Sequence, residues 1–283
     1  MLNVANFFLV KIPIKIRLKF FYFFKFRKLL NLNNPKKYSE KVQARKLNMK
    51  EEFSTLSDKV LVKDYVKNKI GYEYIIKTLY VLDSLDDFNF DTLPSSFVIK
   101  TNFGSGKRHL EIVKDKTVAD INRIKCKFAQ AMQEPFYKGS LLGESQYDKI
   151  NRKILIEEYM SDENQNGISD YKFHLFNYGE DGFLQVDFDR FVCHKRNLYD
   201  LNFDRLPYGL IYSGGTYQLP RKESLEEMLD IAKKLAKEFD YIRVDLYLIN
   251  GKVYFGELTF TPENGFGTFT EPYADKYYGE IWK

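Results

Sequence analysis

The clearest hydrophobic pattern lies in the last third of the chain. Apolar residues recur on one face at helical spacing, namely Leu225, Met228, Leu229, Ala232, Leu235, Ala236 and Phe239. This spacing predicts an amphipathic helix, and Ser224 with Glu227 fits a capping box at its start. Two strands are predicted next, at 241–249 and 252–260, and the Asn250-Gly251 pair between them is a hairpin signal.

The hairpin register decides whether Asp245 and Glu257 share a face. A two-residue turn pairs Val244 with Glu257 and puts the two carboxylates on opposite faces. A three-residue loop that includes Ile249 pairs Arg243 with Glu257 and puts the carboxylates on one face. We expect the three-residue loop, because it gathers the apolar side chains on the other face: Ile242, Val244, Leu246, Leu248, Tyr254, Leu258 and Phe260.

Residues 46–93 are predicted to be helical and to end in an acidic loop at 83–91. The other expected elements are a strand at 96–101, a helix at 117–134, a second strand at 153–160 and a polar loop at 161–169.

The segment 1–45 is basic and aromatic. Apolar and cationic residues alternate from 11 to 20, and 20–26 is almost wholly aromatic, so either a strand or a helix beginning at Pro13 fits. Residues 1–39 hold nine of the 44 Lys and Arg and none of the 39 Asp and Glu, which leaves the body with a net charge of −4. Docking to an anionic membrane surface and a packed element with a solvated basic face both fit.

Composition narrows the class of protein. A chain of 283 residues with 44% hydrophobic residues can form two modest domains or one two-lobed unit. The acidic body disfavours nucleic acid as a partner. Cys126 and Cys193 form neither a disulfide framework nor a metal spacing, which favours a reducing cytoplasm. We expect neither a signal peptide nor a membrane span.

Four segments carry candidate chemistry. They are Ser57-Asp58-Lys59 at the start of a helix, Phe97-Val98-Ile99-Lys100 followed by Gly104-Ser105-Gly106, Leu155-Ile156-Glu157-Glu158-Tyr159-Met160, and Arg243-Val244-Asp245 with Glu257, Thr259 and Thr261-Pro262. In this order the set resembles the ATP-grasp superfamily. Asp170-Tyr171-Lys172-Phe173 and the run from Phe255 to Pro262 are similar to its TupA-like branch, named for a teichuronopeptide-biosynthesis protein, over about residues 35–283.

The resemblance implies an α+β ATP-grasp fold in which two lobes clasp ATP. It places a small lobe at 94–160 and a large lobe with the metal site at 161–283, after the basic segment 1–45 and a helical part at 46–93. Many relatives carry a nucleotide-fold-like domain before this site. Only 58 residues precede Lys59, so we expect no such full domain here.

The resemblance also implies a nucleotide site. Its residues are Lys59, Lys100, Gly104, Ser105, Gly106, Glu157, Glu158, Tyr159, Met160 and Lys172. Phosphates need cations and unobstructed backbone N–H groups, which Lys59, Lys100 and the glycine loop offer. The strand 155–160 edges the adenine in relatives, with Glu157 as the nearby acid. Lys100 as a solvated lysine at a strand end and Glu157 as a surface glutamate are the plainer interpretations.

Asp245 and Glu257 are implied magnesium ligands, because a hard cation prefers carboxylate oxygen. Thr259 stands where the superfamily commonly has Asn, and offers a shorter neutral oxygen to a second magnesium. Arg243 is implied to steady charge on the transferring phosphoryl group. Arg190 and Arg196, the other candidate catalytic residues, lie where relatives place further phosphate-binding cations. Arg243 can instead form a salt bridge to one of the carboxylates, and Arg190 and Arg196 can be surface charges.

The implied reaction converts a carboxylate and ATP to an acyl phosphate and ADP, after which an amine forms an amide. Relatives in surface-polysaccharide pathways point to a uronic acid or acidic polymer as the carboxylate partner, with a small amine or amino acid, in the cytoplasm or at the inner membrane face. An amino-acid-polymerising (polyglutamate-type) or dipeptide ligase is one alternative. A catalytically silent nucleotide-binding accessory protein is another.

Overall fold

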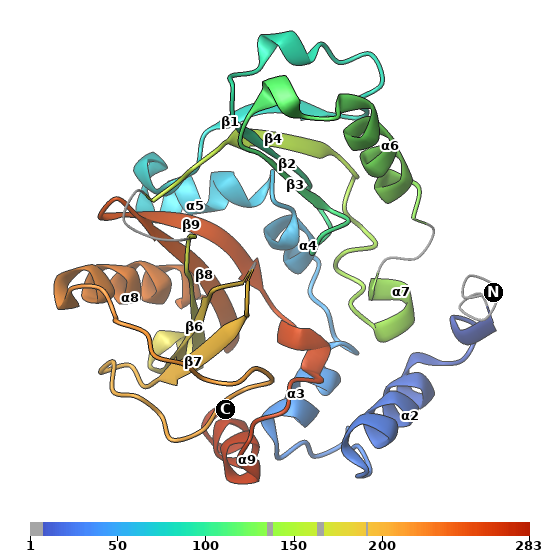
Figure 1. Ribbon diagram of the computed structural model, residues 1–283. Helices are drawn as coiled ribbons and strands as arrows, with labels where there is room; N and C mark the ends of the chain where they lie inside the picture. Colours follow the sequence, from blue (N-terminus) through green and yellow to red (C-terminus); the bar gives the residue numbers. More distant parts are fainter. Residues whose placement is uncertain (1–7, 135–137, 163–166, 191) are drawn as a thin grey trace.

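The computed structural model describes residues 8–134, 138–162, 167–190 and 192–283 (Figure 1). Two antiparallel sheets organise the fold, a four-stranded one in the order β1-β4-β2-β3 and a five-stranded one in the order β7-β6-β5-β8-β9. The strands are β1 Thr78–Leu82, β2 Phe97–Thr101, β3 Leu110–Val113, β4 Ile154–Glu158, β5 Asp170–Phe176, β6 Asp181–Phe188, β7 Lys195–Tyr199, β8 Tyr241–Ile249 and β9 Lys252–Thr259.

Helices cover these sheets and link them, so the fold class is α+β, as expected. The α-helices are α2 Ile14–Phe26, α3 Tyr38–Arg45, α4 Glu52–Ser57, α5 Val62–Ile70, α6 Ile121–Met132, α7 Lys138–Leu142, α8 Lys222–Ala236 and α9 Pro272–Ile281. Short 3-10 turns are η1 Tyr72–Tyr74, η2 Phe90–Thr92, η3 Lys116–Val118, η4 Asn177–Gly179 and η5 Pro262–Gly265.

The five-stranded sheet packs one face on α8. The apolar stripe predicted for this helix is confirmed, since Leu225, Met228 and Leu235 are buried in the same core cluster as β5, β6, β8 and β9. The predicted capping box is wrong. The helix begins at Lys222, and the N–H of Ser224 already donates to the Arg221 carbonyl at 3.1 Å, so Ser224 lies inside the first turn.

The four-stranded sheet contains the strands predicted at 96–101 and 153–160, which the structure has at Phe97–Thr101 and Ile154–Glu158, with α6 packed on it. The prediction that 46–93 is wholly helical is wrong at Thr78–Leu82, because this segment is an edge strand in which Tyr80 pairs with Ile156. Pairing with a strand more than 70 residues away, which no local pattern reveals, decides its conformation. By pairing, β1 belongs to the sheet of the small lobe, and the division into lobes stays a prediction.

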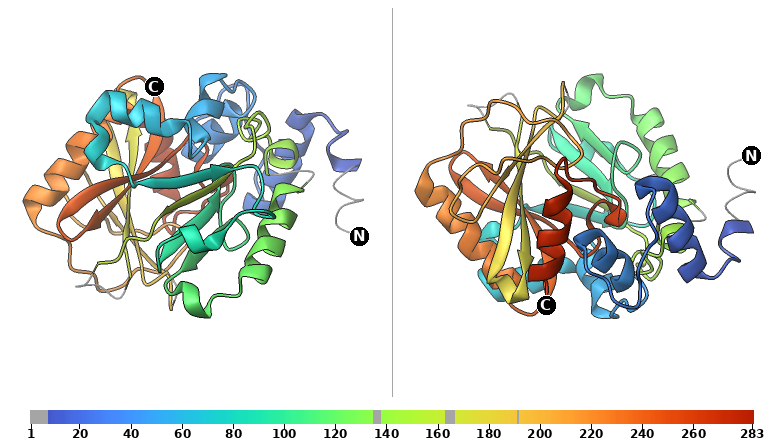
Figure 2. Two further views of the ribbon diagram at one scale, coloured as in Figure 1. Left: turned by 90° about the horizontal axis from the view of Figure 1, so that it is seen from above. Right: turned by 90° about the horizontal axis from the view of Figure 1, so that it is seen from below.

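The described part of the N-terminal segment is helical, which settles the open choice between strand and helix after Pro13. Leu18 and Tyr22 of α2 are buried together with Leu30. Both views of Figure 2 place α2 beside α7, and Arg17 donates from Nη1 to the Leu141 carbonyl at 3.0 Å. The side of α2 that carries Leu18 and Tyr22 is therefore part of the folded body.

The helix α3, near the start of the chain, contacts α9, near its end. The backbone N–H of Ser39 in α3 donates to Asp275 of α9 at 2.8 Å. The hydroxyls of Tyr38 and Tyr241 share a hydrogen bond of 2.7 Å, which ties α3 to the start of β8. Residues near the start of the chain thus support the strand that carries the predicted metal ligands.

Candidate active site

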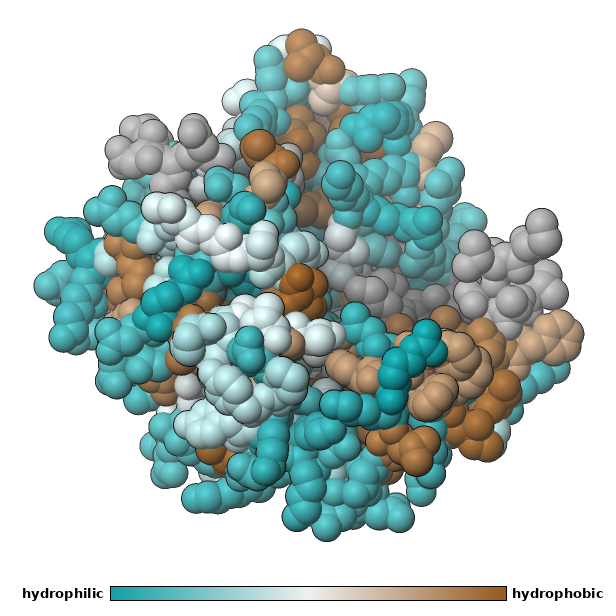
Figure 3. Space-filling model, turned by 60° about the horizontal axis from the view of Figure 1, so that its bottom comes forward, coloured by the Kyte–Doolittle hydropathy of each residue, from teal (hydrophilic) through white to brown (hydrophobic). Residues whose placement is uncertain are grey.

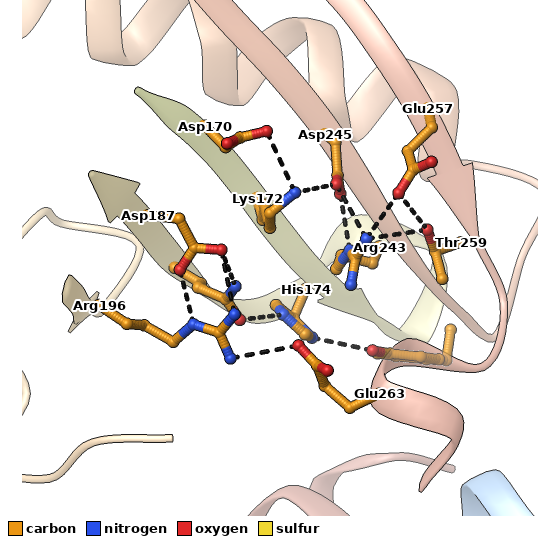
Figure 4. A network of polar contacts seen from close by, with 12 residues as sticks. Asp170, Lys172, His174, Asp187, Arg196, Arg243, Asp245, Glu257, Thr259 and Glu263 are labelled. Atoms are coloured by element: carbon orange, nitrogen blue, oxygen red, sulfur yellow. Dashed lines mark hydrogen bonds and ion pairs between the residues drawn. The ribbon is translucent and has the colours of Figure 1, made fainter. Parts of the chain in front are cut away.

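The face of the five-stranded sheet turned away from α8 is polar. Alternate residues of a strand point to opposite faces. On β5, Phe173 packs in the core against α8, so Lys172 points the other way. On β8, Val244 packs in the same core, and Arg243 and Asp245 point away from it. Figure 4 shows these charged side chains gathered across β5, β8 and β9.

A cleft of about 440 Å³ lies over this polar face. Predicted site residues that line it are Lys59, Gly104, Ser105, Gly106, Lys172, Arg190, Arg196, Arg243, Glu257 and Thr259. Other predicted residues are not among the lining residues, namely Lys100, Glu157, Glu158, Tyr159, Met160 and Asp245. Asp245 is 1% exposed and lies beneath the cleft surface.

The hairpin brings Asp245 and Glu257 together, but not through the predicted loop. The turn is a two-residue one, in which Asn250 and Gly251 both have positive φ (51° and 76°), as a type I′ turn requires. A bulge at Gly256 then shifts the register, so that Asp245 pairs directly with Glu257.

The predicted three-residue loop is therefore wrong, and the shared face is correct. Between the turn and the bulge the apolar face is formed by Val253 and Phe255. Tyr254, expected on that face, pairs with Tyr247 instead and lies on the other face. The hydrophobic pattern changes phase at Gly256, so a single alternation cannot describe β9.

The two carboxylates share one arginine. Arg243 donates from Nε to Asp245 Oδ1 at 2.7 Å, and its Nη2 donates to Asp245 Oδ2 and to Glu257 Oε1, both at 2.9 Å. The same nitrogen donates to Thr259 Oγ1 at 3.1 Å. Lys172 donates to Asp245 and forms a longer ion pair with Asp170 at 3.4 Å. The cluster therefore balances buried acids with buried cations.

The acids of this cluster differ in pKa. Burial raises the pKa of Asp245 despite Arg243 and Lys172. Burial also acts to raise the pKa of Glu257, but Lys59 and Arg243 outweigh it and lower the pKa to about 2. Glu257 is thus held as a carboxylate at the cleft surface.

Lys59 and the glycine loop form the opposite wall. Lys59 Nζ donates to the Gly104 carbonyl at 2.8 Å, and burial lowers its pKa. A Cβ at Gly104 would meet the His109 ring at 2.1 Å, so only glycine fits there. Gly106 has a φ of +79°, which also favours glycine. Backbone of this loop can therefore approach a ligand closely, as a phosphate site requires.

Asn102 is a buried residue of this wall that the sequence patterns did not single out. Its Nδ2 donates to Asp58 Oδ2 at 2.8 Å, and its carbonyl accepts from the backbone N–H of Lys59 at 3.0 Å. It thereby holds Lys59 beside the glycine loop. The feature of the sequence that could have indicated Asn102 is its place directly after the strand 97–101 and before Gly104.

Lys100 is paired rather than exposed toward the cleft. Glu157 is 3% exposed and forms ion pairs with Lys100 and with Lys63, the latter at 2.5 Å. Burial acts to raise the pKa of Glu157, and the two lysines outweigh it and lower the pKa. No sequence pattern indicated Lys63, because it lies on α5, far from β4 in the chain. Glu158, Tyr159 and Met160 follow Glu157 at the end of β4 and are partly or fully exposed.

The remaining arginines form ion pairs at the cleft. Arg196 donates from Nε to Asp187 Oδ1 at 2.6 Å and from Nη1 to Glu263 at 3.2 Å, whereas Arg190 donates to Asp170. Burial acts to raise the pKa of Asp187, but Arg196 lowers it to about 2. Asp187 and Glu263, together with Glu144, are cleft residues that the sequence patterns did not indicate.

Two carboxylates and one hydroxyl converge on the hairpin as oxygen donors, in Asp245, Glu257 and Thr259. Among the residues that the structure describes, no group of three or more His, Cys, Asp or Glu is arranged to hold a metal ion. A cation here would therefore take its other ligands from phosphate oxygens or water, as magnesium commonly does.

Two antiparallel sheets with this cleft beside them have the arrangement of an ATP-grasp fold. The family model described as TupA-like ATPgrasp matches residues 40–283, and the chain belongs to this family. Among curated proteins, no relative matches it.

Several solved structures are similar in fold. D-alanine–D-alanine ligase from Bacillus anthracis, complexed with ATP, is 16% identical with a TM-score of 0.41, over 73% of this chain and 54% of that one. L-amino acid ligase from Bacillus licheniformis is 13% identical with a TM-score of 0.45, over 78% of this chain and 47% of that one. This chain spans about half the length of these structures.

Proposed function

We propose that this chain is an ATP-dependent carboxylate–amine ligase that forms an amide through an acyl phosphate. The observation that carries the proposal is the cross-strand pair of Asp245 and Glu257 beneath a cleft whose other wall is Lys59 and the glycine loop. Family membership supports the nucleotide as ATP.

The donor set fits magnesium, which prefers oxygen ligands. We propose that Asp245 and Glu257 hold one ion and that Thr259 contributes to a second. Magnesium, when bound, neutralises charge on the phosphates during transfer. Of the chain's own residues, Lys59 and the backbone N–H groups of the loop 104–106 hold the phosphates. Arg243 stabilises the negative charge that develops on the phosphoryl group as it is transferred.

The proposed nucleotide site extends to the small sheet. Lys100 and Glu157 lie on the adjacent strands β2 and β4, and the edge of β4 would receive the adenine. Lys172 is held between Asp170 and Asp245 on the polar face, where it keeps the metal-binding carboxylate in place. Glu158, Tyr159 and Met160 are proposed to line the adenine edge where β4 ends.

The proposed reaction has two steps. An oxygen of the substrate carboxylate attacks the γ-phosphorus of ATP, the bond to the β-phosphate oxygen breaks, and ADP leaves. The amine nitrogen then attacks the acyl carbon, phosphate leaves with the bonding electrons, and the nitrogen releases a proton to solvent. Activation is needed because a free carboxylate, already negative, resists attack by an amine.

We propose a uronic acid of a surface polysaccharide as the carboxylate and an amino acid or other small amine as its partner, in the cytoplasm. The cleft carries both cationic and anionic side chains, which supports a carboxylate and an amine as its substrates. Arg190 suits a carboxylate and Glu263 an ammonium group, because each side chain stays partly exposed (44% and 32%) beside its ion pair.

The test is ADP release across a panel of amines, with and without uronic-acid oligosaccharides, followed by mass analysis of the product. ADP release that needs both substrates, with a product heavier by the amine minus water, supports the proposal. Release with amino acids alone would indicate a polyglutamate-type or dipeptide ligase instead.

A catalytically silent nucleotide-binding accessory protein is the second candidate. The observation in its favour is that both oxygens of Asp245 are already engaged by Arg243 and Lys172, while Thr259 replaces the common Asn. ATP binding without ADP release over the whole panel would favour this candidate.

A further inference from the structure

The helix α2 has two apolar faces, of which the fold uses one. Ile14, Leu18, Tyr22 and Phe26 follow one another at intervals of four residues and pack with Leu30 in a core cluster. Packing of this face holds α2 against the rest of the protein. It does not account for the apolar side chains on the opposite side of the helix.

The opposite side is an exposed apolar stripe. It consists of Ile16, Phe20, Phe23 and Phe24 of α2, with Ile12 just before the helix, and we call it the α2 stripe. The spacing of the four helical residues places them on one face of the helix. Ile16 is 57% exposed and Phe24 54%, values that are high for large apolar side chains. Figure 3 shows the apolar surface of this region at the lower right of the molecule.

Cations border the α2 stripe. Lys15 and Lys19 lie in the helix beside it, and Lys25, Arg27 and Lys28 follow at its end, all of them exposed. The first acidic residue of the chain is Glu40. A second copy of this chain would bring like charges together at this surface, which disfavours self-association.

We propose that the α2 stripe docks on a membrane surface that contains anionic phospholipid. Aromatic side chains enter the boundary between headgroups and acyl chains, and lysines and arginines bind the lipid phosphates. The helix would lie in the plane of the membrane. No helix among the residues that the structure describes is long and apolar enough to cross a bilayer.

The attachment of α2 places the cleft near this surface. Arg17 bonds α2 to Leu141 at the end of α7, and the next residue, Leu142, lines the cleft. Ile14 also packs closely on Gly143, where an added Cβ would lie 3.0 Å from it. Ile14 lies on the face of α2 opposite the stripe, so in the docked chain the helix separates this rim of the cleft from the lipid headgroups by about 10 Å, one helix diameter.

The experiment measures co-sedimentation of the full chain with vesicles of equimolar phosphatidylglycerol and phosphatidylcholine, and with vesicles of phosphatidylcholine alone. We expect binding to the anionic vesicles only, and weaker binding as added salt shortens the Debye length below about 8 Å. The exposed stripe is tested with the double variant F20S/F24S and the flanking charges with K15E/K19E. Each should lower binding by about tenfold or more.

Matched variants control for hydrophobicity and charge. Val118→Ser removes an 81% exposed apolar residue elsewhere, and K67E/K237E reverses two exposed lysines away from α2. Both should bind vesicles like the wild type, and all variants should keep the wild-type unfolding temperature because the changed side chains are exposed. Deleting residues 1–28 is less informative, since it removes the buried Leu18 and Tyr22.

Wild-type protein that ignores anionic vesicles, or an F20S/F24S variant that binds them undiminished, would overturn the proposal. Binding to a soluble acidic polysaccharide that F20S/F24S leaves intact, with no vesicle binding, would assign the cations to a carbohydrate partner instead. ADP release in solution should be unchanged in all these variants, so the outcome is independent of the proposed ligase activity.

Discussion

Asp245 and Glu257 are direct cross-strand neighbours, and Gly256 is the extra residue that makes them so. Without this bulge, the two-residue turn at Asn250-Gly251 would put the two carboxylates on opposite faces of the sheet. The bulge returns Glu257 to the polar face, where one nitrogen of Arg243 contacts both acids. A local backbone irregularity thus assembles the oxygen donors of the proposed metal site.

Gly256→Ala should disturb this arrangement. An added Cβ would lie 3.0 Å from both the Asp245 carbonyl oxygen and the Tyr247 ring, so the backbone that carries Asp245 must shift. We expect apparent magnesium affinity to fall about tenfold, with a loss of about 1 kcal/mol in the free energy of unfolding. Magnesium titration of ADP release measures the first effect. Gly209→Ala is the matched control, because its nearest neighbours are 3.5 Å away.

Glu257→Gln and Asp245→Asn should each lower magnesium-dependent ADP release by about 100-fold or more. Each should also cost stability, the second by about 3 kcal/mol because it leaves Arg243 and Lys172 buried with less opposing charge. The first should cost less because the Glu257 side chain is 36% exposed, although Lys59 and Arg243 lower its pKa to about 2 and its charge therefore also stabilises the fold. Full activity of a folded Glu257→Gln protein would show that this carboxylate holds no essential metal.

Lys100→Ala should lower ATP turnover about 100-fold if its ammonium serves the phosphates. Lys63→Ala is the informative comparison, because both lysines pair with Glu157. Lys63 also donates to the Ile76 carbonyl and to Thr78 Oγ1 at 2.8 and 2.7 Å, on β1 and the segment before it. We expect a much smaller loss for Lys63→Ala. Equal losses would mean that both lysines act by positioning Glu157, and unchanged turnover in Lys100→Ala would remove Lys100 from the site.

Asp187 should make stability depend on pH in the acid range. Its pKa is lowered from 3.8 to about 2, with Arg196 outweighing burial. Because the pKa of Asp187 is lower in the folded state, its charge stabilises the fold by about 2 kcal/mol at pH values above 3.8. This stabilisation is lost as the pH falls toward 2. Urea unfolding of wild type and Asp187→Asn from pH 7 to pH about 2.5 measures it. The stability gap should narrow at low pH, and a constant gap would contradict the ion pair.

Local patterns in the sequence sufficed for the elements whose apolar residues have one period. The buried face of α8 follows from its helical spacing, and the strands at 97–101 and 154–158 follow from short runs of β-forming residues. The order of the charged motifs pointed to the family, which the match over residues 40–283 confirms. These signals are readable because each depends on residues close together in the chain.

The tertiary structure decided what depends on distant partners. Thr78–Leu82 is a strand because β4 pairs with it, and the N-terminal segment is a helix because α7 and the Leu30 region receive one of its two apolar faces. The pairing of Glu157 with Lys63 joins α5 to β4. The position of Glu257 depends on a bulge that no alternation pattern contains. In each case the local sequence allows more than one conformation, and the free energy of long-range pairing and burial selects among them.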